Sequence, residues 1–198
     1  LVIHTTLSKS ERSGRVRDVL DAVGLPAAHL DLYPHEISGG QQRRIGIARV
    51  LMLRPSVVIL DEPTSGLDVS VQATVLNLLA ELRQRYSLAY LLISHDLAVV
   101  RKVSDRIAVM YYGKIVEMTT SDELFAHPLH PYTKALLATL DDDGGQLAAL
   151  EPPAPTGGGC RYRTRCPIAR PNCAEIRPEL EPTIDGRQSV ACPYSSSD

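Results

Sequence analysis

The chain has 198 residues, of which 44% are hydrophobic and 22% are charged, proportions that are typical of globular proteins. Its formal net charge is −2, so it lacks the basic excess that nucleic-acid binding or a polybasic membrane surface requires. No apolar stretch approaches the roughly 20 residues that a membrane-spanning helix needs. With no Trp and one Phe, the core is expected to be aliphatic.

The composition changes along the chain. Residues 141–198 hold eight of the 14 prolines and all four cysteines. The segment Asp-Asp-Asp-Gly-Gly at 141–145 is typical of a solvated linker. We therefore expect a regular part up to about residue 140, followed by an irregular extension.

Helix and strand signals alternate in the regular part. A capping box, Ser8-x-x-Glu11, begins a helix that Gly24 ends. Apolar residues at helical spacing predict further helices over 41–53, 69–86 and 96–104, and a short one containing 135–137. Continuous apolar runs at 57–60 and 88–93 predict strands buried on both faces, and 107–111 with 115–118 predict a hairpin. This alternation indicates an α/β fold: a parallel sheet with flanking helices and an antiparallel edge near residue 115.

The first candidate site is Ser38-Gly39-Gly40-Gln41, directly before the helix over 41–53. Two glycines allow a ligand to approach the backbone closely, and a helix N-terminus attracts anions through its unpaired N–H groups. The alternative interpretation is an ordinary serine N-cap followed by flexible glycines.

The second candidate site is Asp61-Glu62, at the end of the apolar run 57–60. The carboxyl ends of strands in a parallel sheet are where α/β proteins bind ligands. Asp61 could hold Mg²⁺, usually through water, and Glu62 could polarise an attacking water. The alternative is two solvated acids. In the loop that follows, Asp68 is expected to cap the next helix.

The third candidate is His95, which follows the second apolar run. If the two strands are parallel, His95 lies at the same sheet edge as Glu62, where its imidazole could contact a γ-phosphate. A surface histidine without a role is the alternative.

Cys160, Cys166, Cys173 and Cys192 lie in a proline-rich segment with too little apolar material for a core of its own. A four-cysteine iron–sulfur cluster fits thiols on an irregular loop. Zinc is an alternative, although no pair of these cysteines has the usual spacing of zinc ligands. Disulfides and free thiols are the remaining possibilities.

Taken together, these motifs resemble the ATP-binding subunits of ABC transporters. Ser38 to Gln41 resemble the signature motif, Asp61-Glu62 the Walker B motif, Ser65 to Asp68 the D-loop, and His95 the H-loop histidine. The segment His130-Pro131-Tyr132-Thr133 and the cysteine-bearing tail resemble the C-terminal extension of oligopeptide, dipeptide and nickel importers. The resemblance implies a P-loop NTPase-like fold in three parts: 1–55 in the helical subdomain, 56–118 in the ATPase core and 119–198 in the extension.

The resemblance also implies a role for each residue. Ser38, Gly39, Gly40 and Gln41 would contact the ATP of a second ATPase subunit, identical or paralogous. Asp61 would assist Mg²⁺, Glu62 would be the general base, His95 would sense the γ-phosphate and Asp68 would couple the two sites. Two membrane-spanning permease subunits and, indirectly, an extracytoplasmic solute-binding protein are the implied partners, with no nucleic acid. The implied location is the cytoplasmic face of a bacterial or archaeal membrane.

The tail resembles the cluster-bearing tails of dipeptide importer ATPases, which favours a [4Fe–4S] cluster on Cys160, Cys166, Cys173 and Cys192. Such a cluster would be structural.

Two departures from the family pattern stand out. No Gly-x-x-x-x-Gly-Lys-Ser/Thr sequence occurs in the 198 residues, so the phosphate-binding Walker A loop is missing. We therefore expect a fragment of such a subunit that hydrolyses little ATP alone and leaves apolar sheet faces uncovered. The order Arg43-Arg44 after the signature also differs from the commoner Gln-Arg, which we expect to have little consequence.

Other functions stay open at this point. The chain could be a non-catalytic module that donates its signature motif to a partner ATPase. It could be a soluble ABC ATPase outside transport, or a small iron–sulfur protein in its own right.

Overall fold

The computed structural model describes residues 1, 3, 5–140 and 157–195. The chain divides into two compact units, Leu1–His95 and Asp96–Asp198. The expected boundaries at residues 55 and 118 were drawn from sequence motifs. The two compact units do not test them, so these boundaries stay a prediction. The expected linker at 141–145 lies outside the described residues.

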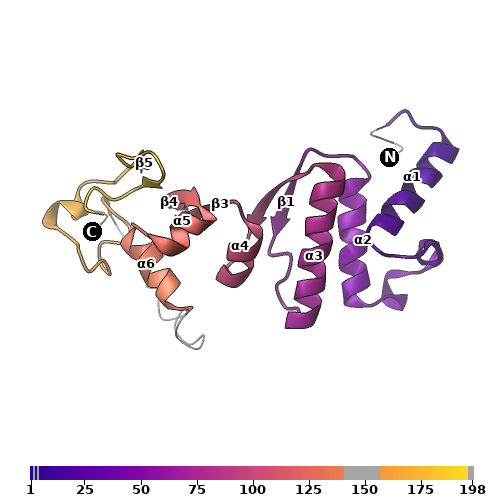
Figure 1. Ribbon diagram of the computed structural model, residues 1–198, viewed down its shortest axis with the longest axis horizontal. Coiled ribbons are helices and arrows are strands. Elements are labelled where there is room, and N and C mark those ends of the chain that lie inside the picture. The colour runs from indigo at the N-terminus through magenta and orange to yellow at the C-terminus, as the bar shows by residue number, and fades with distance from the viewer. Residues whose placement is uncertain (2, 4, 141–156, 196–198) are drawn as a thin grey trace. The chain divides into compact units, whose positions relative to one another are not determined.

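The described residues of the first unit form three α-helices, two short 3₁₀ helices and two strands (Figure 1). In chain order these are α1 Lys9–Ala22, η1 Ala27–Asp31, η2 Pro34–Glu36, α2 Gly39–Leu51, β1 Val57–Asp61, α3 Val69–Tyr86 and β2 Ala89–Ile93. The three predicted helices of this unit are present, although α2 begins two residues earlier than the expected residue 41.

The capping box that was predicted for α1 is present. The Glu11 amide donates to Ser8 Oγ at 3.3 Å, and the Ser8 amide donates to Glu11 Oε2 at 2.7 Å. The helix ends at Ala22 with Val23 as its C-cap residue, and Gly24 follows with φ +68°. Glycine adopts this left-handed conformation without the steric cost of a side chain.

The two strands of the first unit pair in parallel, as predicted, with Val57 opposite Ala89 and Asp61 opposite Ile93. The register brings the carboxyl ends of both strands to the same edge. Figure 1 shows α2 and α3 side by side next to β1. Residues from all three helices and from β1 share one apolar core: Val19, Leu20, Val23, Leu25, Ala48, Leu51, Val58, Leu78, Leu82 and Leu88.

The prediction that these strands are buried on both faces is wrong for the described residues. Val58 faces the core and is 9% exposed, whereas Val57 and Ile59 on the opposite face are 57% and 65% exposed. Successive side chains of a strand point to opposite faces of the sheet, and α1 to α3 cover one of them.

The second unit contains the antiparallel strands. Its elements are α4 Leu97–Val103, β3 Arg106–Tyr111, β4 Lys114–Thr120, α5 Ser121–Ala126, α6 Pro131–Ala138, η4 Pro171–Ala174, β5 Glu181–Pro182 and β6 Ser189–Val190. The predicted hairpin is present as β3–β4. It is not an edge of the parallel sheet, however, because it forms a separate sheet of order β3-β4-β6-β5 with two strands from the tail.

A buried carboxylate organises the middle of this unit. Glu117 on β4 is fully buried. Its Oε1 accepts the Leu129 amide at 2.8 Å and its Oε2 accepts the His130 amide at 2.9 Å. A buried carboxylate is tolerated when its oxygens accept hydrogen bonds. Glu117 therefore fixes the chain that leads into α6 against β4.

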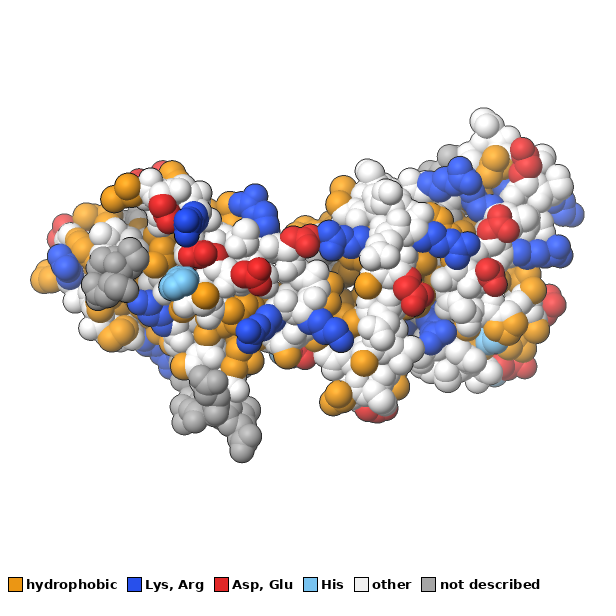
Figure 2. Space-filling view, in the orientation of Figure 1, with side chains coloured by type: hydrophobic (Ala, Val, Ile, Leu, Met, Phe, Trp, Pro, Cys, Tyr) orange, Lys and Arg blue, Asp and Glu red, His pale blue; other side chains and the backbone are white. Residues whose placement is uncertain are grey.

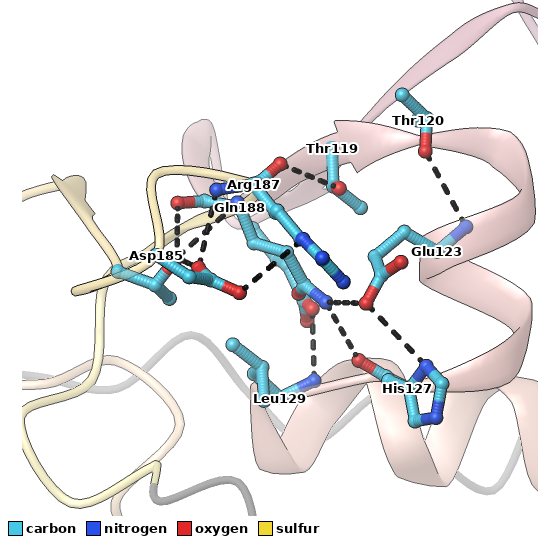
Figure 3. A network of polar contacts seen from close by, with 10 residues as sticks. Thr119, Thr120, Glu123, His127, Leu129, Asp185, Arg187 and Gln188 are labelled. Atoms are coloured by element: carbon cyan, nitrogen blue, oxygen red, sulfur yellow. Dashed lines mark hydrogen bonds and ion pairs between the residues drawn. The ribbon is translucent and has the colours of Figure 1, made fainter.

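The tail is attached to the same region by polar contacts (Figure 3). Gln188 Nε2 donates to Glu123 Oε1 at 3.3 Å and to the His127 carbonyl at 3.1 Å. Thr119 Oγ1 donates to the Arg187 carbonyl at 3.1 Å. These bonds, together with the pairing of β6 with β4, make the end of the tail part of the second unit.

His130 begins α6. Its Nδ1 accepts the Tyr132 amide at 3.0 Å, and Pro131 occupies the first helical position, where no amide is needed. The ring is 2% exposed, and burial lowers the pKa of His130 from 6.5 to about 4. The His-Pro-Tyr segment is thus a helix start held by a neutral histidine.

The surface of the described residues carries mixed charge. On the face shown in Figure 2, Lys and Arg side chains lie among Asp and Glu side chains. Among the described helices, none has both the length and the apolar character that crossing a membrane demands.

Replacing His130 with Asn tests the buried imidazole. The unfolded chain binds a proton at His130 below pH 6.5, whereas the folded chain does so only near pH 4. This group therefore makes the stability fall as the pH decreases from 6.5 to 4, by up to about 3 kcal/mol. Asn keeps a short acceptor for the Tyr132 amide but does not titrate. We expect urea unfolding of His130→Asn to lose that part of the pH dependence.

The exposed His127 provides the control, since its side chain is 71% exposed. The variant His127→Asn should retain the fall in stability between pH 6.5 and 4. Equal pH dependence in the wild type and in His130→Asn would contradict the assignment.

Candidate functional site

Glu62 occupies a strained position directly after β1. Its φ is +47°, a left-handed conformation that costs a residue with a side chain on the order of 1 kcal/mol. The Glu62 amide donates to the Ile93 carbonyl at 2.9 Å and so extends the pairing of β1 with β2. Strain of this kind concentrates at functional sites. The backbone bond directs the chain so that Glu62 lies beside the end of β2.

Glu62 and His95 contact each other at that edge. Glu62 Oε1 accepts the His95 amide at 3.2 Å and lies 2.7 Å from His95 Nδ1. The His95 side chain is 73% exposed and that of Glu62 is 36% exposed. The parallel pairing thus brings together two residues 33 positions apart, as expected from the sequence. The result is an accessible carboxylate, one of whose two oxygens is held in place by the imidazole of His95.

Asp61 is the last residue of β1 and is exposed beside this pair. Among the described residues, no ion pair or hydrogen bond engages its carboxylate. Carboxylate oxygens are the protein ligands that Mg²⁺ prefers, usually together with water. An accessible carboxylate with no protein partner fits that requirement.

The signature-like segment forms the start of α2. Ser38 Oγ accepts the Gln41 amide at 3.3 Å, and Gln41 Oε1 accepts the Ser38 amide at 2.8 Å. These bonds complete a capping box, so the interpretation of Ser38 as an N-cap is correct. An anion could still reach the amides of the first turn.

Neither glycine of this segment is held by close packing. A Cβ at Gly39 would meet nothing within 4 Å, and one at Gly40 would lie 4.0 Å from Val71 Cγ1. Packing within the chain therefore does not require glycine at either position. The absence of side chains at the start of α2 has a function only if a ligand or another chain approaches its backbone closely.

Asp68 differs from expectation. It occupies the N-cap position of α3, but its side chain makes no capping hydrogen bond. The carboxylate is exposed instead. The predicted capping role is therefore wrong, and Asp68 is accessible at the end of the loop that begins at Glu62.

Sequence reasoning missed one connection within this site. Arg43 on α2 donates from Nη1 to the Pro63 carbonyl at 2.5 Å and from Nη2 to the Ser65 carbonyl at 2.6 Å. Neither carbonyl can be recognised as an acceptor from residue types alone. The only signal in the sequence was Arg43 itself, the first of two arginines after the glycines.

The four cysteines converge in the second unit. All are free thiols and all line one small cavity of about 20 Å³, together with His130 and Tyr162. Burial is the main cause that raises the pKa of the Cys160 and Cys166 thiols. Among the described residues, no three His, Cys, Asp or Glu side chains are arranged to hold a single metal ion. The structure therefore gathers the thiols without forming a metal-ion site.

Gly159 allows the cysteine segments to approach each other. The Cys160 amide donates to the Cys173 carbonyl at 2.8 Å. Gly159 has φ +79°, and a Cβ there would lie 2.4 Å from the carbonyl oxygens of Cys173 and Ala174. No side chain fits at that distance, so glycine is required here.

Two family models match this chain. The model described as ABC transporter matches residues 1–65, and the model described as oligopeptide/dipeptide transporter, C-terminal region, matches residues 116–173. The oligopeptide transport ATP-binding protein OppF of Salmonella typhimurium is 48% identical over 96% of this chain and 59% of its own length. The di/tripeptide transport ATP-binding protein DppF of Pseudomonas aeruginosa is 45% identical, over 98% and 62%.

The oligopeptide transport ATP-binding protein AppF of Bacillus subtilis is similar as well, at 47% identity over 96% of this chain and 60% of its own length. The chain thus spans about three fifths of the length of these curated relatives.

Solved structures show the same fold class. The cbiO1 protein of Clostridium perfringens, part of an ABC transporter complex, matches with a TM-score of 0.57 and 33% identity, over 63% of this chain and 49% of that one. An ATP-binding cassette of an ABC transporter in its ADP conformation matches with a TM-score of 0.57 and 22% identity, over 69% and 54%. The predicted α/β ATPase fold is confirmed.

Replacing Gly159 with Ala tests the packing of the cysteine segment. The added Cβ cannot be accommodated against two carbonyl oxygens, so we expect a loss of about 2 kcal/mol or more in the stability of the second unit. The loss is measurable by urea unfolding with tyrosine fluorescence. Faster reaction of Cys160 and Cys173 with a thiol reagent should accompany it.

Gly158→Ala is the matched control, because a Cβ at Gly158 meets nothing within 4 Å. If both variants unfold at the same urea concentration as the wild type, the close approach at Gly159 is not a constraint on this segment.

Proposed function

We propose that this chain, which is similar to ATP-binding proteins of ABC transporters, is the ATP-hydrolysing part of a subunit that energises peptide import. The Glu62–His95 pair at the end of two parallel strands carries the proposal. Two observations support peptides as the cargo: the match of residues 116–173 to a peptide-transporter region, and the peptide-transport names of the relatives.

In the proposed reaction, Glu62 acts as the general base. Its carboxylate is partly exposed and is held by the His95 amide and imidazole, so an attacking water could donate to the second oxygen. His95 leaves its other ring nitrogen for a phosphate oxygen. Asp61 would hold Mg²⁺, which neutralises charge on the phosphates.

The signature-like segment serves a different nucleotide in this proposal. Ser38 and Gly39 are exposed at the start of α2, and Gly40 is partly exposed. The amides of this helix start, with Gln41, would contact the γ-phosphate of an ATP held mainly by a second ATPase subunit. Asp68, exposed and without a capping bond, would contact that subunit beside the shared nucleotide. The sequence itself has no Gly-x-x-x-x-Gly-Lys-Ser/Thr loop, so the phosphates need such a loop from elsewhere.

The proposal includes the partners that such a subunit needs. These are a second ABC ATPase, identical or paralogous, two membrane-spanning permease subunits and a solute-binding protein outside the membrane. The protein would act at the cytoplasmic face. ATP hydrolysis by the Glu62→Gln variant distinguishes a catalytic chain from one that only lends its signature motif to a partner.

We further propose that the four cysteines hold a [4Fe–4S] cluster. They line one cavity and all are free thiols. Each cysteine of such a cluster binds a different iron, so the four sulfurs need not converge on one point as the ligands of a single ion do. The cluster would supply a structural cross-link to a segment with few apolar residues. Zinc, which needs a tetrahedral single-ion site, fits this arrangement less well.

Glu62→Gln tests the catalytic proposal in the subunit assembled with its transporter partners. Gln keeps the shape but cannot accept a proton, so we expect Mg-ATP hydrolysis to fall by about 100-fold or more, with ATP binding retained. Glu81 is an exposed glutamate on α3, so the matched control Glu81→Gln should leave hydrolysis unchanged. The 198-residue chain alone should hydrolyse little.

Unchanged hydrolysis in Glu62→Gln would remove Glu62 as the base. Assembly-dependent ATP hydrolysis that needs Ser38 and Gly39 but is unaffected at Glu62 would favour the non-catalytic module instead.

The cluster proposal has its own test. We expect protein purified without oxygen to contain iron and acid-labile sulfide and to absorb broadly in the visible range. Cys173→Ser should lose all three signals. Zinc in place of iron, or neither metal in anaerobic protein, would contradict the proposal. ATP hydrolysis is not part of this readout.

A further inference from the structure

Arg43 connects two parts of the first unit that sequence motifs treat as separate. It lies on α2, two residues after Gln41. Its guanidinium bridges the carbonyls of Pro63 and Ser65 at 2.5 and 2.6 Å. Both acceptors lie within three residues of Glu62. One planar side chain thus joins the helix that begins at Gly39 to the loop that carries Glu62.

Two backbone hydrogen bonds within this loop are long, so the contacts from Arg43 add to its support. The Ser65 amide donates to the Glu62 carbonyl at 3.2 Å, and the Leu67 amide donates to the Thr64 carbonyl at 3.3 Å. Bonds from a guanidinium are charge-assisted, and two from the same fork also fix direction. Arg43 is partly buried, which further limits competition from water.

Arg44, the next residue, has different partners. Its Nη1 lies 3.4 Å from the Val23 carbonyl and 3.5 Å from the Gly24 carbonyl, at the end of α1. The expectation that Arg43-Arg44 in place of the commoner Gln-Arg has little consequence stays a prediction, but the two side chains have separate partners. Arg43 faces the loop after β1, and Arg44 faces α1.

We propose that Arg43 is a positioning residue that couples the signature-motif helix to the catalytic loop. This inference rests on the proposed function, in which Ser38 to Gln41 contact one ATP and Glu62 acts on another. A movement of α2 when its start engages a nucleotide is transmitted through the guanidinium to Pro63 and Ser65. Arg43 thereby links the two nucleotide sites of a dimer within a single subunit.

A purely structural role makes a different prediction from coupling. If Arg43 only stabilised the fold, its loss would lower the unfolding temperature and leave the kinetics of the folded fraction unchanged. If Arg43 positions the loop, its loss changes kcat and the cooperativity between the two sites, and leaves the KM for ATP almost unaffected.

The test uses Arg43→Gln and Arg43→Lys in the subunit within the assembled transporter. We expect Arg43→Gln to lower kcat about ten-fold, as loss of a charge-assisted pair predicts. The KM for ATP should stay within about two-fold, and the Hill coefficient should fall toward one. Lys offers no planar fork, so Arg43→Lys should recover only part of kcat. Arg49→Gln, an exposed residue of the same helix, is the charge-matched control and should resemble the wild type.

Amide hydrogen exchange provides a second readout that does not depend on activity. Exchange at Ser65 and Leu67 should accelerate in Arg43→Gln, whereas exchange in the middle of α3 should not. Wild-type kcat and Hill coefficient in Arg43→Gln, with Glu62→Gln inactive, would overturn the coupling while sparing the proposed function. A wild-type protein without ATP hydrolysis would overturn both, and unchanged exchange would overturn the anchoring itself.

Discussion

The parallel pairing of β1 with β2 is the constraint on which the candidate site depends. It places Asp61 opposite Ile93 and extends by one bond from the Glu62 amide to the Ile93 carbonyl. That bond holds Glu62 in a left-handed conformation and brings its carboxylate to His95. A shift of the register by one residue would separate the carboxylate from the imidazole and turn the core-facing Val58 outward. Packing of the core and geometry of the site are thus set by the same pairing.

One face of the β1–β2 pair is uncovered because the helices of the first unit pack on the opposite face. Val57 and Ile59 are as apolar as Val58, yet they lie more than half exposed because α1, α2 and α3 all pack on the other side. Strands with apolar side chains on both faces are typical of sheets that are covered twice. The described residues supply one of the two layers.

Much of the fold follows from local sequence signals. Ser8 with Glu11, and Ser38 with Gln41, begin helices through bonds that span three residues, and such bonds depend on local residue types. The parallel strands and the meeting of Glu62 with His95 follow from apolar runs of the right length. The reach of Arg43 to two carbonyls, the positive φ of Glu62 and the uncapped Asp68 depend on tertiary packing. No pattern of residue types encodes them.

In the second unit, too, the contacts that join distant parts of the chain could not be predicted from the sequence. The hairpin was visible in the sequence, but its partner β6 was not, because two residues of regular structure give no periodicity. The sequence also does not predict that Glu117, a glutamate within an apolar strand, is buried and accepts two backbone amides.

The docking of the tail on β4 has a consequence for how the protein is made. The bond from Thr119 to Arg187 joins residues 68 positions apart, and that from Gln188 to Glu123 joins residues 65 apart. Contacts of such high sequence separation form slowly, because a long loop must close before any of them is gained. During synthesis, the edge of β4 that pairs with β6 stays unpaired until Ser189 and Val190 have left the ribosome. Docking of the tail is therefore a late step in the folding of the second unit, and proteolysis would compete with closure of that edge.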